Sequence, residues 1–377
     1  MRAFLIVVVI ALLGAAGVAG YLWYSIEKPY SAFAKEGVFV EVPHGASLRA
    51  TSRILQQHGV VRSAMAFELY ARRHPKRKMV AGEYFFDHSI TAKDVFWKIA
   101  SGEIFEQPFT VHEGDTMLDI AHNLEAAKLI SATEFLIAAK DPKQIRDIAP
   151  DAKSLEGFLF PATYNIAHHT TAADLTTTMV HKFRDAMQAI APDRLDPLTP
   201  GTPLLSLVTL ASIVESETPK PDERPLVAGV YTNRLHNHML LQCDPTIIYA
   251  LKQADLYNPP LTYKDLHYDS PYNTYRRPGL PPGPIGNPGE TSLRAAVAPA
   301  QTDYLYFVAN TQGGHFFAST LAQHNQNVAK YHRLLNGDPA DPPVTEVKPQ
   351  PVKHHHTTSA KKKASTKRKA SAKQGKQ

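Results

Sequence analysis

The chain has 377 residues, 44% of them hydrophobic, which is enough apolar material for a substantial core spread over two or three domains. The net charge is +6, but residues 337–377 hold ten Lys/Arg and three Asp/Glu, so the rest of the chain carries −1. This near-neutral balance argues against a nucleic-acid enzyme, and the single cysteine, Cys243, excludes an intramolecular disulfide.

The first expected element is an apolar helix at the N-terminus. Residues 3–24 contain no charged side chain and end in an aromatic edge at residues 21–24. About 20 such residues span a bilayer core, so residues 1–25 are predicted to be a cytoplasmic stub and a membrane anchor. Arg2 favours a cytoplasmic N-terminus with the bulk of the chain outside. The alternative is a cleaved signal peptide with a small-residue site at residues 17–19.

Residues 36–105 have the pattern of a small α+β subdomain. The sequence predicts a strand at 38–42, helices at 48–58 and 64–73, and an aromatic strand near 84–86. Ser47 is expected to cap the first of these helices.

A second subdomain with the same order is predicted at residues 106–153. It opens at Phe109 and continues into a helix over 117–130. The turns after Val42 and Val111 match in register, and both resemble the start of LysM-type units, small βααβ modules associated with glycan chains. The alternative is an ordinary strand-turn-helix with no glycan contact.

The predicted catalytic domain covers residues 154–335. An aromatic-rich run at 155–164 reads mostly as core, although Glu156 is placed at a surface or cleft where it contacts substrate. Helices are predicted at 172–190 and 203–218, the latter with Thr202 as N-cap.

Two carboxylates, Glu215 and Glu217, end this last helix. Helical spacing continues one apolar row into Glu215 and another into Glu217, and residues two apart point about 200° from each other. They therefore cannot form the facing acid and nucleophile of a two-carboxylate glycosidase, and only one belongs in the site. Apolar surroundings and the negative end of the helix dipole raise a carboxyl pKa, which suits a proton donor near neutral pH. Spacing alone does not choose between the two.

Polar residues after this helix are candidates for substrate contact. A helix is expected over 224–235 and another after Asp244 as N-cap, followed by Pro/Gly-rich loops that line a groove. Ser216 and Thr246 are expected to hydrogen-bond the catalytic carboxyl. The candidate substrate-binding residues are Ser216, Glu217, Gln242, Asp244, Thr246, Asn273 and Tyr275. Helix capping and turn chemistry are the alternative explanation for each.

No metal and no cofactor are expected. His236 and His238 are two apart on a predicted helix and do not make a two-histidine metal motif, and His354–His356 is short and unsupported. The tail at 336–377 is predicted to be disordered because it has few apolar residues. Its lysine runs, at 361–363 and 367–369, are either solvated or attract anionic lipid or cell wall.

Linked motifs along the chain resemble the YceG-like family of endolytic murein transglycosylases. The motifs are residues 211–218 (ASIVESET), 233–235 (NRL), Gln242, 244–246 (DPT), 272–275 (YNTY), 279–283 (GLPPG), 304–309 (YLYFVA) and 313–316 (GGHF). The resemblance extends from the anchor to about residue 335. Cys243, where small or polar residues are usual, and the long basic tail depart from the family pattern.

The resemblance implies a single-pass inner-membrane protein with a periplasmic catalytic domain that cleaves peptidoglycan glycan strands internally. By the family's motif the catalytic acid falls on Glu215. The implied partners are glycan strands, the inner membrane and peptidoglycan synthases, with no nucleic acid. The fold class is then α+β: a transmembrane helix, LysM-like subdomains, a mainly helical catalytic domain and a disordered tail. The alternative functions are a non-catalytic glycan-binding scaffold and a water-using muramidase.

Overall fold

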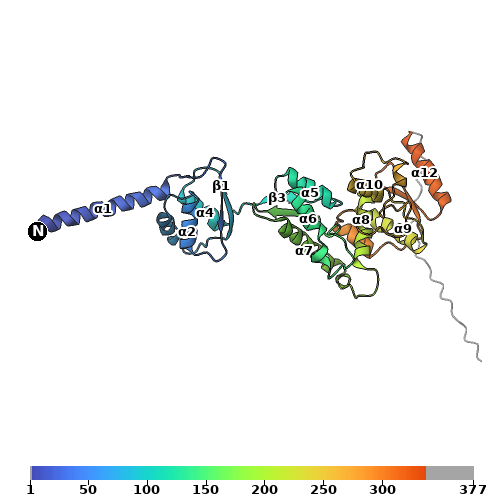
Figure 1. Cartoon of the computed structure of the whole chain (residues 1–377), viewed down its shortest axis with the longest axis horizontal. Helices are drawn as coiled ribbons and strands as arrows, with labels where there is room; N and C mark the ends of the chain where they lie inside the picture. Colours follow the sequence, from blue (N-terminus) through green and yellow to red (C-terminus); the bar gives the residue numbers. More distant parts are fainter. Residues whose placement is uncertain (1, 337–377) are drawn as a thin grey trace, which may run out of the picture.

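The computed structural model describes residues 2–336. The chain is elongated: a long N-terminal helix leads into a small domain, and a larger domain follows (Figure 1). The predictions for the tail, including the lysine runs and His354–His356, concern residues that lie outside the described part of the chain.

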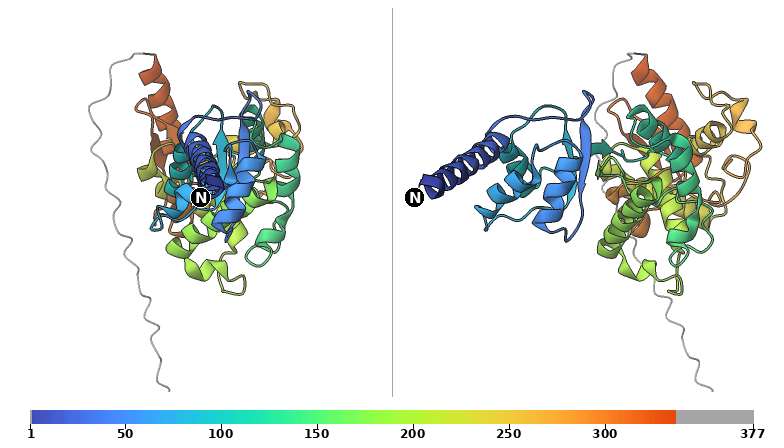
Figure 2. Two further views of the ribbon diagram at one scale, coloured as in Figure 1. Left: turned by 90° about the vertical axis from the view of Figure 1, so that its left-hand side faces the viewer. Right: turned by 60° about the vertical axis from the view of Figure 1, so that its left-hand side comes forward.

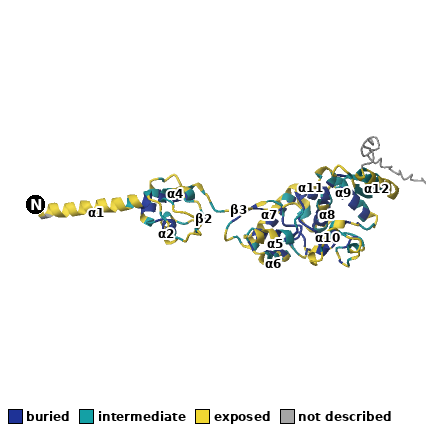
Figure 3. Cartoon of the chain, turned by 90° about the horizontal axis from the view of Figure 1, so that it is seen from above, coloured by how far each residue is buried: buried dark blue, intermediate teal, exposed yellow. Residues whose placement is uncertain are grey.

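Helix α1 (Arg2–Glu27) forms where the apolar N-terminal run was predicted. Residues Phe4–Glu27 are long and apolar enough to cross a membrane by length and composition, and none of the most apolar stretch is buried within the protein. Figure 3 shows this exposure along nearly the whole helix. A retained anchor and a signal sequence both meet this test.

The small domain is built on a two-stranded antiparallel sheet. Its elements are β1 (Val38–Val42), α2 (Leu48–Gln57), α3 (Ala64–Arg72), β2 (Gly82–Phe86) and α4 (Ala92–Ser101). The predicted strand-helix-helix-strand order is confirmed, and the Ser47 side chain caps α2 as expected. The helix α4 follows this unit and completes its core, to which Val95, Phe96 and Ile99 contribute.

The larger domain begins with a second antiparallel pair of strands. Its first elements are β3 (Gln107–Thr110), α5 (Met117–Ala126), α6 (Ala132–Lys140), β4 (Thr163–Ile166) and α7 (Ala172–Ile190). The predicted helix over 117–130 ends at Ala126 instead, because the chain turns at Lys128, which has φ +57°. β3 pairs with β4, and one core continues from Phe109 to Ala296, so the predicted boundary between residues 153 and 154 is wrong.

Helices dominate the rest of the larger domain. The elements are α8 (Leu204–Glu217), α9 (Arg224–His236), α10 (Asp244–Gln253), α11 (Glu290–Val297), β5 (Tyr306–Ala309), β6 (His315–Ala318) and α12 (Leu321–Leu335). Within residues 2–336, four short 3-10 helices lie in the connections of the larger domain: Pro142–Ile145, Pro192–Leu195, Pro221–Glu223 and Asp265–His267. Pro203, not Thr202, is the N-cap of α8, and no side chain caps it.

Helix α8 lies at the centre of this arrangement. It packs against α9, α10 and α11, and residues 207–214 are all buried (Figure 3). A helix that is apolar around its circumference can be stable in water only when neighbours cover every face. The C-terminal turn of α8 therefore places the carboxyl groups of Glu215 and Glu217 at the edge of the hydrophobic core.

A buried polar cluster ties the loop before α11 to the start of the larger domain. The Asn287 side chain accepts from the backbone amides of Gly157 and Leu159, both at 2.9 Å, and donates to the Asp115 carbonyl at 2.8 Å. Glu156 accepts from the Met117 amide at 3.0 Å and from the Tyr249 hydroxyl at 3.1 Å. Burial raises the pKa of Glu156 to about 8. The prediction that Glu156 contacts substrate at a cleft is wrong, because its side chain is enclosed.

Gly157→Ala should destabilise the domain by about 3 kcal/mol. Gly157 has φ +86°, and an added Cβ would lie 2.5 Å from Pro284 and 2.8 Å from Val208 of α8. The expected loss combines left-handed backbone strain with overpacking. Gly279→Ala is the matched control: it has φ +84° and nothing within 4 Å, so it should cost only about 1 kcal/mol. Equal losses in urea unfolding would contradict this packing account.

Candidate active site

Glu215 and Glu217 leave the last turn of α8 in different directions and enter different environments. Glu215 faces the first turn of α9 and the loop before α11, whereas Glu217 faces the middle of α9 and the start of α10. Residues two apart in an α-helix differ in direction by about 200°, so the side chains of Glu215 and Glu217 point to different sides of α8. Each environment decides what its carboxyl can do.

The Glu215 carboxylate is held in a buried ion pair. Arg224 donates from Nη2 to Oε1 at 2.5 Å, and the Gly289 amide donates to Oε2 at 2.9 Å. The side chains of Glu215 and Arg224 are only 4% and 5% exposed. Burial raises the pKa of Glu215, while the Gly289 amide and Arg224 oppose the rise because both stabilise the ionised form. Arg224 also contacts Glu113 at 3.4 Å and hydrogen-bonds Thr291, which joins α9 to the loop after β3 and to the first turn of α11.

Within residues 2–336 the hydrogen-bonding partners of Glu217 are neutral, although Arg234 and His315 line the same cavity. The Tyr231 hydroxyl donates to its Oε1 at 2.5 Å, and the Cys243 thiol lies within hydrogen-bonding reach of the same carboxyl. Burial raises the pKa of Glu217, and the two hydrogen bonds offset part of that rise. A carboxyl in this setting is suited to hold a proton and to release it.

Glu217 also lines a cavity of about 260 Å³. Its walls come from the end of α8, from α9, from the start of α10, from the loop that carries Tyr275 and from the β5–β6 hairpin. The lining residues are Glu217, Tyr231, Arg234, Leu241, Gln242, Asp244, Tyr275, Phe307, Val308, Ala309 and His315. A polar cavity with aromatic side chains in its walls suits a saccharide.

Four of the predicted site residues meet in this cavity: Glu217, Gln242, Asp244 and Tyr275. Gln242 has φ +52°, a conformation that points an exposed side chain to the cavity. The Tyr275 hydroxyl donates to Asp244, which is the first residue of α10. The predicted capping role of Asp244 is wrong, because Cys243 is the N-cap and no side chain caps this helix.

Three other predicted residues have structural contacts instead. Ser216 donates to the Ser212 carbonyl at 3.0 Å, and Thr246 donates to the Cys243 carbonyl at 2.7 Å. The expected hydrogen bonds from these two side chains to the Glu215 carboxyl are therefore not formed. Asn273 is fully buried and donates to the carbonyls of Leu266 and Tyr268. The prediction that Asn273 positions a sugar is therefore wrong: its side chain shapes the loop that carries Tyr275.

The sequence analysis did not identify Arg224 and Tyr231, the two α9 residues that hydrogen-bond Glu215 and Glu217 respectively. Arg224 and Tyr231 are seven residues apart, which is two helical turns, so both lie on the side of α9 that faces α8. The signal available in the sequence was their spacing: an arginine and a tyrosine seven residues apart in a predicted helix that directly follows the two glutamates. His236 ends α9, and His238 lies beyond it with φ +54°, so the two histidines do not share a helix.

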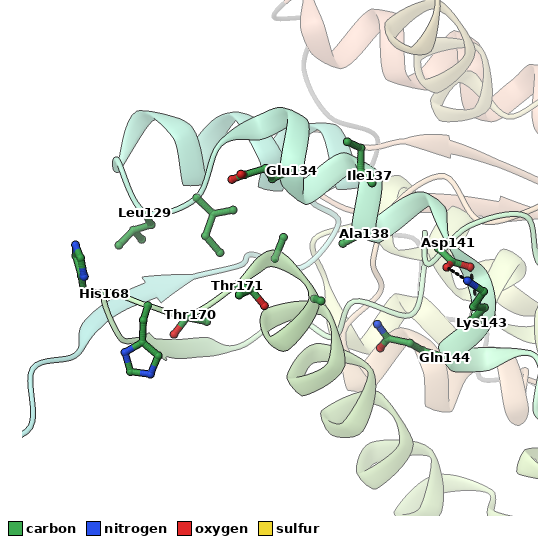
Figure 4. A pocket seen from close by; sticks show the side chains of 14 residues that line it. Leu129, Glu134, Ile137, Ala138, Asp141, Lys143, Gln144, His168, Thr170 and Thr171 are labelled. Atoms are coloured by element: carbon green, nitrogen blue, oxygen red, sulfur yellow. Dashed lines mark hydrogen bonds and ion pairs between the residues drawn. The ribbon is translucent and has the colours of Figure 1, made fainter. Parts of the chain in front are cut away.

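A larger cavity of about 650 Å³ lies between α6 and residues 168–173 (Figure 4), and none of its lining residues belongs to α8. Asp141 in its wall pairs with Lys143 at 3.0 Å, and this hydrogen bond lowers the pKa of Asp141. Such a carboxylate stays ionised and is unsuited to donate a proton. The cavity beside Glu217 is the better candidate site, because burial raises the pKa of Glu217 and four residues predicted from the sequence line this cavity.

Comparison with known proteins agrees with the motifs. The model of the YceG-like family matches residues 40–330. An endolytic murein transglycosylase of Bacillus subtilis is 32% identical over 323 residues, which cover 81% of this chain and 88% of the relative. Another, of Streptococcus pneumoniae, is 30% identical over 370 residues, which cover 88% of this chain and 65% of the relative.

A solved structure leads to the same family. The crystal structure of a YceG-like protein from Listeria monocytogenes has a TM-score of 0.52 and 32% identity, and the match covers 78% of this chain and 99% of that one. The family model matches most of the chain, and the relatives and the solved structure are 30–32% identical to it. This chain belongs to the YceG-like family.

Proposed function

We propose that this protein is a membrane-anchored lytic transglycosylase, a lyase that cleaves peptidoglycan glycan strands internally. The names of its relatives support the reaction class. The observation that carries the proposal is the Glu217 carboxyl, which burial keeps ready to be protonated at the wall of a polar cavity. Of the two carboxyls that line this cavity, Asp244 is exposed and Glu217 is the more buried, and a lytic reaction needs only one proton donor.

We assign the general acid to Glu217 in place of Glu215, the residue on which the family resemblance placed it. A general acid must carry a proton and reach the substrate. Glu215 is closed off by Arg224 and the Gly289 amide, and both donors favour its ionised form. Glu217 meets only neutral donors and faces the cavity with Tyr275 and Gln242. In this assignment the Glu215–Arg224 ion pair positions the end of α8 and takes no part in proton transfer.

The proposed bond is the one between N-acetylmuramic acid and N-acetylglucosamine. Protonated Glu217 gives its proton to the glycosidic oxygen, the C1–O bond breaks, and an oxocarbenium-like centre develops at the muramyl C1. The muramyl C6 hydroxyl closes on C1 and returns its proton to the Glu217 carboxylate. The intramolecular attack gains from proximity and requires no activated water. The product is a 1,6-anhydromuramyl end, which would terminate elongation of a nascent strand.

The proposed location follows from α1. With the uncharged part of α1, residues 4–24, in the inner membrane, the small and the larger domain lie in the periplasm, where glycan strands are accessible. We propose peptidoglycan synthases as partners, since a protein in this location would act on the strands that they make. The order β1, α2, α3, β2 supports a LysM-like role in glycan contact for residues 36–105.

The chemistry of new strand ends should identify the reaction. Purified glycan strands incubated with the full chain and analysed by mass spectrometry should yield 1,6-anhydro ends from within the strand. Reducing ends would show a water-using muramidase. Strands that bind but gain no new ends would show a glycan-binding scaffold.

The two glutamates should separate in activity. Glu217→Gln removes the proton donor and should lower the cleavage rate about 100-fold or more while glycan binding remains. Glu215→Gln should keep a larger share of the cleavage rate and instead lower the unfolding temperature, because it removes the closer and more buried of the two counter-charges of Arg224. Strand cleavage and thermal unfolding of both variants check this. The reverse order of cleavage rates would return the acid to Glu215.

Tyr231→Phe should move the alkaline side of the pH–rate profile. The Tyr231 hydroxyl stabilises the ionised form of Glu217, so its removal raises the Glu217 pKa further. Because the acid must be protonated, activity should persist to a pH higher by on the order of one unit. Tyr272→Phe, which changes a hydroxyl next to Tyr249 outside this cavity, is the control and should leave the profile in place. An unchanged profile in Tyr231→Phe would argue against Glu217 as the acid.

A further inference from the structure

Helix α1 joins the small domain without a flexible linker. Ser25 and Ile26, near its end, are buried in that domain, and Glu27 pairs with Lys93 of α4 at 2.5 Å. The Arg62 guanidinium lies 4.9 Å from the centre of the Tyr24 ring. These contacts fix the direction in which the domain leaves the helix, as the views in Figures 1 and 2 show.

This rigid junction fixes which side of the domain faces a membrane. The uncharged run of α1 is about 33 Å long at 1.5 Å per residue, close to the thickness of a bilayer core, so Tyr24 falls at the outer interface. Helix α1 packs on α3 and α4, while β1 lies on the far side of the domain, toward the larger domain (Figure 1). The α3–α4 side is therefore the side next to the lipid headgroups.

That side carries an exposed tryptophan. Trp97 follows Lys93 by four residues on α4, so it shares the helical face that meets the end of α1. Its side chain is 40% exposed. The ring lies 5.6 Å from the Arg77 guanidinium, which brings the segment after α3 onto the same side.

Arg77, which reaches Trp97, belongs to a run of cations that follows α3. Arg73, Lys76, Arg77 and Lys78 are all exposed, and within residues 2–336 none of them forms an ion pair. We call these four residues and Trp97 the juxtamembrane face. Cations without counter-charges beside an exposed indole form the combination that anionic headgroups and the membrane interface accommodate.

We propose that the juxtamembrane face lies on the membrane and binds the phosphate groups of anionic lipids, with Trp97 at headgroup depth. This inference rests on the proposed insertion of α1. The small domain is then held to the bilayer at two places, the end of α1 and this face. Two attachments restrict tilting, and the cavity beside Glu217 is kept at a set height above the membrane.

The test uses the tryptophan count. The chain has two tryptophans, so in full-length Trp23→Phe only Trp97 fluoresces as an indole. This protein is placed in nanodiscs of phosphatidylcholine brominated near the headgroup, with or without phosphatidylglycerol. Trp97 should lose most of its fluorescence, relative to unbrominated discs, when phosphatidylglycerol is present, and should recover it in high salt. Similar quenching with and without phosphatidylglycerol would overturn the role of lipid charge.

Matched charge reversals complete the design. Arg73→Glu/Lys76→Glu should abolish the quenching, whereas Arg49→Glu/Arg53→Glu changes two exposed cations on α2 and should leave it intact. If the chain enters the discs but Trp97 is not quenched, the docking is wrong and the anchor stands. If the chain does not enter the discs, the anchor and the docking are both wrong.

Discussion

The last turn of α8 carries two carboxyl groups, two residues apart: one is paired with a cation, and the other is hydrogen-bonded by neutral groups. Glu215 meets a buried cation and a backbone amide, and Glu217 meets a phenol and a thiol. Because the pKa of a buried carboxyl depends on the charges and donors around it, the two carboxyls at one helix end experience different electrostatic environments. The division depends on burial of the whole helix, since a solvated end would give both groups the same environment.

The packing of α9 on α8 maintains this division. Arg224 and Tyr231 come from one row of α9, so the relative position of the two helices selects a partner for each glutamate. The Asn287 cluster holds the loop before α11, which supplies the Gly289 amide, to the first part of the larger domain. The site is thus assembled from segments far apart in the chain, and one continuous core links the stability of β3 to the geometry at Glu217.

Local patterns in the sequence were sufficient for most of the secondary structure. The helix over 172–190 and the strand at 38–42 have the predicted bounds, because hydrophobic periodicity and capping residues act over a few residues. The boundary placed after residue 153 failed, since pairing of β3 with β4 joins segments about 50 residues apart and leaves no local mark. The contacts of Asn273 and Thr246 were missed for the same reason. Composition predicts that a turn is present, but not which side chains are buried within that turn.

The sequence by itself determined an apolar N-terminal helix, the strand-helix-helix-strand unit of residues 38–86, and an apolar helix that ends in two glutamates pointing apart. These follow from spacing, which is a property of the chain alone. Only the tertiary structure decided which glutamate faces a cavity, because the cation beside Glu215 comes from α9 and the cavity wall beside Glu217 comes from the β5–β6 hairpin. The charge state of a buried group is set by neighbours in space, and those neighbours are known only once the helices have packed.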